Sequence, residues 1–226
     1  MPPTKLTPAV EDYLKIIYEL TSQHGRANTN QIAVAMDVRP GSVTGMLQKM
    51  AAFTPPLVKY EKYRGVMLTP EGKRAALKVT RHHRLLERFL HETLGFPWDE
   101  VHAEAHRLEH VISKKFEERM DAVLGYPQFD PHGAPIPSRD LELPSSASIR
   151  MQDLHVGQRA VVQRVPDDTP ALLRYLAEQG LALHASFEVL ECSPLDGSLK
   201  IQVEKKPGPI ELPPTITGEI FVTIKD

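Results

Sequence analysis

The sequence predicts a mainly α-helical protein with some β-structure, divided into three domains. They are a winged helix-turn-helix over residues 1–74, a helical domain over 75–145 and a small β-barrel over 146–226. Three observations predict this order. Apolar residues recur at helical spacing through the first half of the chain, a hairpin pattern interrupts them at residues 57–68, and short β-type runs follow a Pro-rich stretch.

Composition excludes several classes of protein. The chain has 226 residues, a net charge of −2 and a single cysteine, Cys192, so no internal disulfide framework is expected. No apolar run is long enough to span a bilayer, and the N-terminus lacks the pattern of a signal peptide, which predicts a cytoplasmic protein. Residues 1–75 carry ten Lys and Arg against six Asp and Glu. This basic excess permits binding to nucleic acid.

Three helices are predicted in the first fifty or so residues. A Thr-Pro pair at residues 7–8 is typical of a helix start, and apolar residues at i, i+3, i+4 and i+7 from Val10 carry the helix to about residue 20. A second helix is expected at about 30–36, and residues 37–40 break the chain before a third. Two helices joined by so short a turn indicate a helix-turn-helix, although a plain helical pair with a solvated face is the alternative.

A β-hairpin is predicted directly after the third helix. Residues 57–61 alternate apolar and polar, Arg64-Gly65 supplies a turn, residues 66–68 return, and Thr69-Pro70 starts the next helix. A basic wing after a helix-turn-helix is a common way to grip DNA. The side chains that we expect to contact DNA are Arg39, Ser42, Thr44, Gln48, Lys49, Lys62 and Arg64.

Two long helices are predicted in the middle of the chain, at about 70–94 and 99–124. The second carries His102, His106, Glu109 and His110, spaced i, i+4, i+7 and i+8, so on one continuous helix all four would lie along one side. Clustered imidazoles and a carboxylate indicate a divalent metal site, and a solvated polar face is the alternative. The first helix adds His82, His83 and Glu87 as possible partners.

The last part of the chain changes character. Residues 126–148 are rich in Pro, Ser and Gly, which predicts an extended linker and a domain boundary. Beyond it we expect one helix at 170–179 among short strands that form a compact barrel. The strands are expected at 160–165, 187–192, 198–203 and 219–224.

In this order, the elements resemble the diphtheria toxin repressor family of metal-dependent transcription regulators over nearly the whole length. The likeness is closest in EDYLKIIYEL (11–20), RPGSVTGMLQKM (39–50), YEKYRGVMLT (60–69), RHHRLLERFL (81–90) and VHAEAHRLEHVIS (101–113), and FDPHGAPIP in the linker is similar as well. The resemblance implies that the C-terminal barrel is SH3-like.

The resemblance also implies two metal sites. The main site would combine Asp12 with His106, Glu109 and His110, and the second would combine His83, Glu87 and His102, with Asp168 of the barrel as an extra ligand. Iron-type members carry sulfur donors where this chain has Asp12 and His106. Carboxylate and imidazole donors favour Mn(II) first and Fe(II) second, and such a site would also take Zn(II) in vitro. Manganese-type members carry Glu one turn after Asp12, where this chain has Lys15.

The implied function is a homodimeric, Mn(II)- or Fe(II)-activated repressor of metal-uptake genes that binds a palindromic operator and is not an enzyme. An enzyme alternative comes from residues 106–110, which satisfy the H-x-x-E-H motif of inverted zinc peptidases. The rest of the architecture of those enzymes does not accompany the motif. A metal-storage protein is a third class, and the winged-helix pattern argues against it.

Overall fold

A computed structural model of the chain describes residues 6–145 and 148–225. It separates into two compact units, one of residues 1–83, 109–112 and 137–142, the other of residues 84–108, 113–136 and 143–226. The predicted domain limits at residues 1, 146 and 226 lie outside the described residues. Each unit has its own hydrophobic core.

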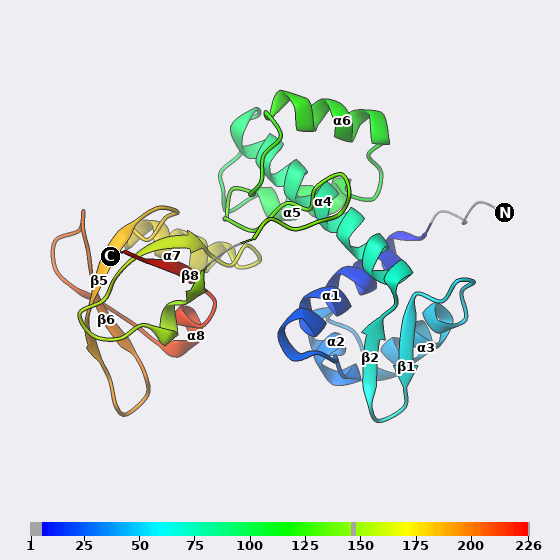
Figure 1. Cartoon of the computed structure of the whole chain (residues 1–226), viewed down its shortest axis with the longest axis horizontal. Helices are drawn as coiled ribbons and strands as arrows, with labels where there is room; N and C mark the ends of the chain where they lie inside the picture. Colours follow the sequence, from blue (N-terminus) through cyan, green and yellow to red (C-terminus); the bar gives the residue numbers. More distant parts are fainter. Residues whose placement is uncertain (1–5, 146–147, 226) are drawn as a thin grey trace. The chain divides into compact units, whose positions relative to one another are not determined.

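The first unit contains the predicted winged helix-turn-helix. Helices α1 (Pro8–His24), α2 (Thr29–Ala35) and α3 (Pro40–Ala51) pack beside the antiparallel hairpin of β1 (Val58–Glu61) and β2 (Gly65–Leu68), as Figure 1 shows. The apolar face predicted for α1 is buried from Val10 to Ile17, and Leu47 of α3 packs in the same core. These elements therefore form because their apolar faces share one core.

Local signals set the ends of these elements. Asn28 and Gln31 form a reciprocal capping box at the start of α2. At the end of the hairpin, Thr69 accepts the backbone N–H of Gly72 at 3.1 Å and begins α4 (Pro70–Glu92). A Cβ on Gly72 would collide with the backbone of Leu57, so only glycine allows this close approach.

The prediction of a single helix over residues 99–124 is wrong. The chain forms α5 (Val101–Leu108), a turn at 109–112, and α6 (Lys114–Val123). The break follows from Ser113, whose hydroxyl accepts the backbone N–H of Phe116 at 3.2 Å and caps a new helix. Helical spacing therefore does not hold across residues 102–110.

The predicted linker is also partly wrong, because residues 130–134 are buried rather than solvated. Asp130 accepts the backbone N–H groups of His132 and Ala134 at 2.8 and 2.9 Å, and this turn holds the stretch in shape. The backbone N–H of Val165 donates to the carbonyl oxygen of His132 at 3.0 Å, and a Cβ on Gly133 would collide with the backbone of β4. The segment is thus fixed against the barrel.

The C-terminal part is a six-stranded antiparallel sheet in the order β3-β8-β4-β5-β6-β7. The four predicted strands and the predicted helix are confirmed, while β3, β7, a single 3-10 turn (Met151–Asp153) and α8 were not predicted because each is very short. The bounds are β3 (Ile149–Arg150), β4 (Arg159–Arg164), α7 (Pro170–Glu178), β5 (Ser186–Cys192), β6 (Leu199–Val203), β7 (Ile210–Leu212), α8 (Pro214–Thr217) and β8 (Phe221–Lys225).

Among the described residues, no helix is both long enough and apolar enough to cross a membrane.

Candidate metal centre

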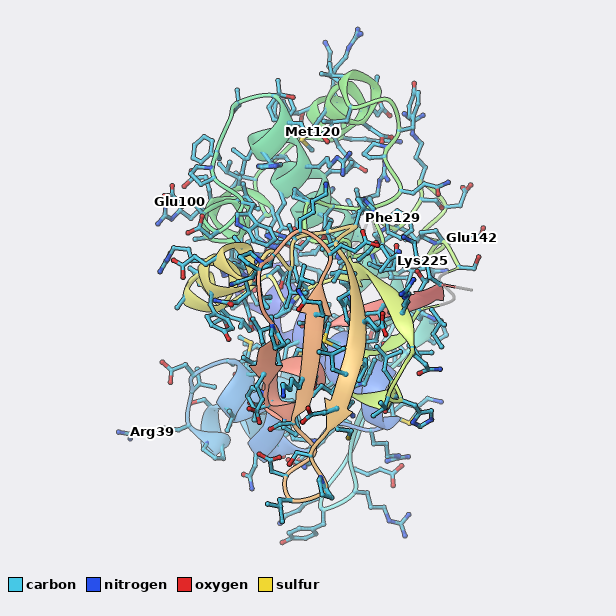
Figure 2. All side chains as sticks on the ribbon, turned by 90° about the vertical axis from the view of Figure 1, so that its left-hand side faces the viewer. Arg39, Glu100, Met120, Phe129, Glu142 and Lys225 are labelled. Carbon is cyan, nitrogen blue, oxygen red and sulfur yellow. The ribbon has the colours of Figure 1, made fainter. Side chains whose placement is uncertain are left out.

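The predicted DNA-binding side chains lie on the outer face of the winged helix-turn-helix. Ser42, Gln48 and Lys49 of α3 are exposed, and Arg39 at the start of α3 extends away from the fold in Figure 2. Thr44 is half-buried, and its hydroxyl donates to the carbonyl oxygen of Pro40 at 3.2 Å.

The tip of the wing is basic and exposed. Lys62 lies 5.0 Å from the centre of the Tyr63 ring, and the side chain of Arg64 is 79% exposed. Glu61 contacts Arg64 at 3.4 Å and Arg26 at 3.3 Å, and both guanidinium groups, Arg26 first, lower the pKa of Glu61. The predicted set thus forms one accessible, mostly basic surface within the first unit.

The first unit also contains a cluster that we call the main centre: Asp12, Glu109 and His110. One potential ligand atom from each lies within 4.8 Å of the others. His110 Nε2 is 2.9 Å from Asp12 Oδ1 and 3.4 Å from Glu109 Oε1. Asp12 comes from α1 of the DNA-binding helices, while Glu109 and His110 come from the turn after α5.

Glu11, which was not among the predicted metal ligands, orients His110. Its Oε2 lies 2.7 Å from His110 Nδ1, and a carboxylate oxygen can only accept, so Nδ1 carries the hydrogen. The lone pair of the neutral ring is then on Nε2, which faces Asp12 and Glu109. A carboxylate that fixes the ring of a metal-binding histidine in this way is the usual outer partner of such ligands.

Glu109 is fully buried and is surrounded by basic groups. Lys15 Nζ lies 3.0 and 3.2 Å from its two carboxylate oxygens, and His83 Nδ1 lies 2.6 Å from Oε2. Burial raises the pKa of Glu109, but His83 and Lys15 outweigh it and hold the pKa at about 2. The ring of His82 contacts the backbone oxygen of Glu109 at 3.0 Å, which fixes the main chain at this residue.

The four residues predicted to share one helix face do not form one site. His106 lies on the last turn of α5, three and four residues before Glu109 and His110 along the chain. His102, one turn earlier, belongs instead to a cluster in the second unit, because its Nδ1 lies 3.2 Å from Glu87 Oε1. His83 lies one turn before Glu87 on α4 and contacts Glu109.

We call the cluster in the second unit the second centre; its members are Glu87, His102, Asp130, His132 and Asp167. His102 Nδ1 is 3.9 Å from Asp167 Oδ2, so the structure brings Asp167 to this cluster where the sequence suggested Asp168. Asp168 instead accepts the hydroxyl of Thr169 at 3.1 Å. The resemblance implied an acid near Asp168, and the acid that lies at this cluster is one residue earlier in the chain.

Asp130 and His132 were missed altogether. They lie in the segment interpreted as linker, and both are fully buried. No local pattern in this stretch marks either residue, because Asp is mostly exposed in folded proteins and the burial of both depends on contacts with distant parts of the chain.

The ring of His132 is fixed so that one nitrogen faces carboxylates. Its Nε2 lies 2.8 Å from the carbonyl oxygen of Trp98, so it donates there, and its ring stacks on that of Trp98 with centroids 5.8 Å apart. The lone pair is then on Nδ1, 4.0 Å from Glu87 Oε1. Among the described residues this nitrogen has no hydrogen-bond partner, and neither does Asp130 Oδ2.

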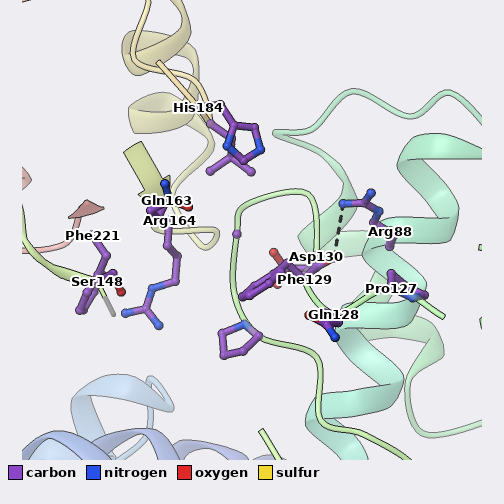
Figure 3. A pocket seen from close by; sticks show the side chains of 13 residues that line it. Arg88, Pro127, Gln128, Phe129, Asp130, Ser148, Gln163, Arg164, His184 and Phe221 are labelled. Carbon is purple, nitrogen blue, oxygen red and sulfur yellow. Dashed lines mark hydrogen bonds between the residues drawn. The ribbon is translucent and has the colours of Figure 1, made fainter. Parts of the chain in front are cut away.

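The second centre carries excess negative charge in a buried place. Burial, followed by the charge of Glu87, raises the pKa of Asp130 to about 7, and Arg84 at 3.7 Å from Asp130 Oδ2 only partly opposes this. Arg88 donates to the carbonyl oxygen of Phe129 at 3.3 Å and helps to hold the segment (Figure 3). Beside the segment, a cavity of about 420 Å³ extends to Arg164 and Phe221 of the barrel.

Both centres suit a divalent cation. Each places carboxylate oxygens against imidazole nitrogens whose lone pairs point among them, an arrangement in which the donors repel one another unless a positive charge lies between. Among the described residues, neither centre contains sulfur. Oxygen and imidazole donors suit Mn(II) and Fe(II) better than softer ions.

Comparisons with known proteins identify the family of each part of the chain. The family model for the N-terminal DNA binding domain of the iron dependent repressor matches residues 5–66. The model for the metal binding and dimerisation domain of the iron dependent repressor matches residues 69–138. The FeoA domain model matches residues 149–224. Together these models span nearly the whole chain.

Similar proteins extend over most of the chain. The iron-dependent repressor IdeR of Mycobacterium leprae is 32% identical over 202 residues, which are 84% of this chain and 86% of that protein. The HTH-type transcriptional regulator MntR of Oceanobacillus iheyensis is 38% identical over 120 residues, 53% of this chain and 80% of that protein. A solved manganese-dependent transcriptional repressor in complex with manganese has a TM-score of 0.87 at 35% identity, covering 96% of this chain and 100% of that chain.

Proposed function

The chain belongs to the iron-dependent repressor family, the one that includes the diphtheria toxin repressor, and from this premise we propose how it works. It is a metal-dependent, DNA-binding transcriptional repressor of the Mn(II)- and Fe(II)-responsive kind. It is a transcription regulator rather than an enzyme, so the zinc-peptidase alternative is not supported. The H-x-x-E-H stretch crosses the end of α5 and does not lie on one helix.

The observation that supports the mechanism is the position of Asp12. We propose that His106 joins the three residues of the main centre in binding one cation, and that Asp12 is the ligand that comes from α1. Because α1 packs on α2 and β2, holding Asp12 stabilises one position of α1 and hence of the recognition surface. A metal that binds this arrangement better than its alternatives raises DNA affinity by linkage.

We propose Mn(II) as the ion that the main centre senses, with Fe(II) as the second choice and Zn(II) as an ion bound in vitro. The donor set is oxygen and imidazole, which suits the first two ions. The second centre, made of Glu87, His102, Asp130, His132 and Asp167 with His83 one turn away, would bind a further ion that fixes the segment at residues 127–136. Its mutually repelling donors, of which Glu87, Asp130 and His132 are fully buried, support this role.

The remaining parts of the proposal concern partners. A homodimer would present two recognition helices to DNA. The side chains that would approach bases or phosphates are Arg39, Ser42, Thr44, Gln48 and Lys49. The phosphates would be held by Lys62 and Arg64 at the wing. A dimer with two-fold symmetry binds a palindromic operator, and the genes controlled would be those of metal uptake. A repressor of such genes works in the cytoplasm. Dimerisation through α4, α5 and α6 is consistent with the exposed Phe116 and Val123 on α6.

The experiment that tests the function is a gel shift on genomic fragments with Mn(II), Fe(II), Zn(II) or a chelator. We expect retarded fragments with Mn(II) that disappear with the chelator. The His106→Ala variant should weaken Mn(II)-dependent binding at least tenfold, about 1.4 kcal/mol, because it removes one ligand from the centre. DNA binding that ignores the metal, or a His106→Ala variant that matches the wild type at limiting Mn(II), would contradict the proposal.

A further inference from the structure

Lys15 is a buried lysine placed among groups that normally bind metal ions. Its side chain is only 11% exposed, and Nζ lies 3.0 and 3.2 Å from the two oxygens of Glu109 and 3.3 Å from Nδ1 of His83. A buried ammonium is costly unless it is paired, so these contacts explain why Lys15 tolerates burial.

The pairing is with Glu109 rather than with His83. Nδ1 of His83 lies 2.6 Å from Glu109 Oε2, and a carboxylate oxygen only accepts, so Nδ1 donates its hydrogen there. The ammonium has no acceptor to offer and cannot donate to the same nitrogen in that tautomer. Lys15 therefore binds both oxygens of Glu109, with the imidazole beside it.

Glu109 consequently lies between two places that can each hold a positive charge. On one side are Lys15 and His83, and on the other are Asp12 and His110, with His110 Nε2 at 3.4 Å from Glu109 Oε1. The second side offers two carboxylates and an imidazole to a cation. The first side offers a carboxylate and an imidazole, and there the positive charge is the ammonium of Lys15.

From this arrangement we infer that Lys15 is a built-in cation that takes the position of a second divalent ion and limits the main centre to one metal ion. The inference rests on the proposed metal centre and adds its stoichiometry. The ammonium compensates negative charge on Glu109 that two metal ions would otherwise share. Its own positive charge repels a divalent ion from the His83 side. Reversing this charge should open that side, because a carboxylate at position 15 would lie beside Glu109, and His83 would become a third donor once its hydrogen moves from Nδ1 to Nε2.

The test is to count Mn(II) ions on the folded full-length protein. Native mass spectrometry of the wild type and of Lys15→Glu, each loaded with excess Mn(II), should show one more ion per chain in the variant. Electron paramagnetic resonance should show only isolated Mn(II) in the wild type. In Lys15→Glu it should show an exchange-coupled pair, because the two ions would share Glu109. Lys115→Glu on the exposed face of α6 is the matched charge reversal and should bind the same number of ions as the wild type.

The outcomes separate this inference from the proposed function. A wild type that binds no Mn(II) overturns the metal centre and the inference together. A wild type that binds Mn(II) while a folded Lys15→Glu gains no ion overturns the role of Lys15 alone, and so does a coupled pair in the wild type. If Lys15→Glu does not fold, titrating the wild type to saturation still decides: isolated ions throughout support the inference, and a coupled pair overturns it.

Discussion

The two centres use the same donor types but balance their charge differently. At the main centre, the ammonium of Lys15 contacts both oxygens of the buried Glu109, and with His83 it holds the pKa of that carboxyl at about 2. At the second centre Arg84 lies 3.7 Å from Asp130 Oδ2, and burial together with Glu87 raises the pKa of Asp130 to about 7. The cation of the main centre therefore contacts both oxygens of its carboxylate, whereas Arg84 lies farther from Asp130 and only partly compensates its charge.

This difference in charge balance indicates that a metal ion has a different role at each centre. At the main centre the local charge is largely settled without an ion, so a metal ion can act as a signal that holds Asp12 of α1 to the turn after α5. At the second centre the donors stay in conflict until a proton or a cation is added, so an ion there acts mainly on the stability of the buried segment.

The largest effect is expected when Lys15 is removed. Lys15→Met keeps the length of the side chain but leaves the carboxylate of Glu109 buried without its ammonium. The free energy of unfolding of the metal-free protein should fall by about 3–5 kcal/mol, measured by urea denaturation in the presence of a chelator. Lys115→Met, on an exposed helix face, should stay within about 0.5 kcal/mol of the wild type. Equal losses in both variants would mean that the main centre does not depend on its internal cation.

The next effect concerns the coupling of metal to DNA. Asp12→Ala removes the ligand from α1 but leaves Glu109, His110 and His106, so metal should still bind while most of the metal-induced gain in DNA affinity, about 1–3 kcal/mol, is lost. Fluorescence anisotropy of a labelled operator, titrated with Mn(II), measures this gain. Asp12 is 23% exposed in the first turns of a helix, where an acid is also favoured by the helix dipole. If that were its only role, the titration curves of variant and wild type would overlay.

A comparable variant in the second centre should behave differently. Trp98 is the single tryptophan of the chain and stacks on His132, so its fluorescence reports on the second centre. Mn(II) should quench it in the wild type. Glu87→Gln should require at least tenfold more Mn(II) for the same quenching, which corresponds to about 1.4 kcal/mol. The reason is that the substitution removes the negative charge of the Glu87 carboxylate, which lies between His102 and His132.

The same probe offers a crossed control. Asp12→Ala should leave the Trp98 quenching curve unchanged, while Glu87→Gln should keep most of the metal-induced gain in DNA affinity. If Asp12→Ala shifted the quenching curve as much as Glu87→Gln does, the two centres would not be separate, and the division between a signalling and a stabilising ion would have to be abandoned.

The contrast between the centres also marks how far the sequence could predict the molecule. The winged helix-turn-helix was predictable because apolar spacing from Val10 onward and the turn at Arg64-Gly65 are local signals. The single helix at 99–124 failed because the capping hydroxyl of Ser113 outweighs the continuing pattern. The buried turn at Asp130 and His132 was invisible, because it depends on hydrogen bonds within a stretch whose composition is that of a linker.

In the candidate site, too, the sequence could predict some residues but not the partners that contact them from distant parts of the chain. Asp12, Glu109 and His110 were expected from the resemblance, and the structure brings them together, but their partners Glu11 and Lys15 were not assigned roles. Both roles arise from contacts between residues more than ninety positions apart, which no local spacing can show. Long-range electrostatic partners are therefore the part of such a centre that needs a structure.

The smallest effect is expected at the wing, and it tests whether metal coupling belongs to the main centre alone. Arg64 is 79% exposed, and its ion pair with Glu61 at 3.4 Å is of the solvent-exposed kind that contributes little to stability. Arg64→Ala should therefore leave stability unchanged but remove about one phosphate contact. The slope of log affinity against log salt concentration should flatten by about one unit, equally for operator and for unrelated DNA. The gain in DNA affinity from Mn(II) should stay that of the wild type, because Arg64 is not part of the metal centre.

An Arg64→Ala loss of affinity confined to one operator base pair would mean that the wing reads sequence. A reduced response to Mn(II) would mean that the metal acts through the wing as well as through α1.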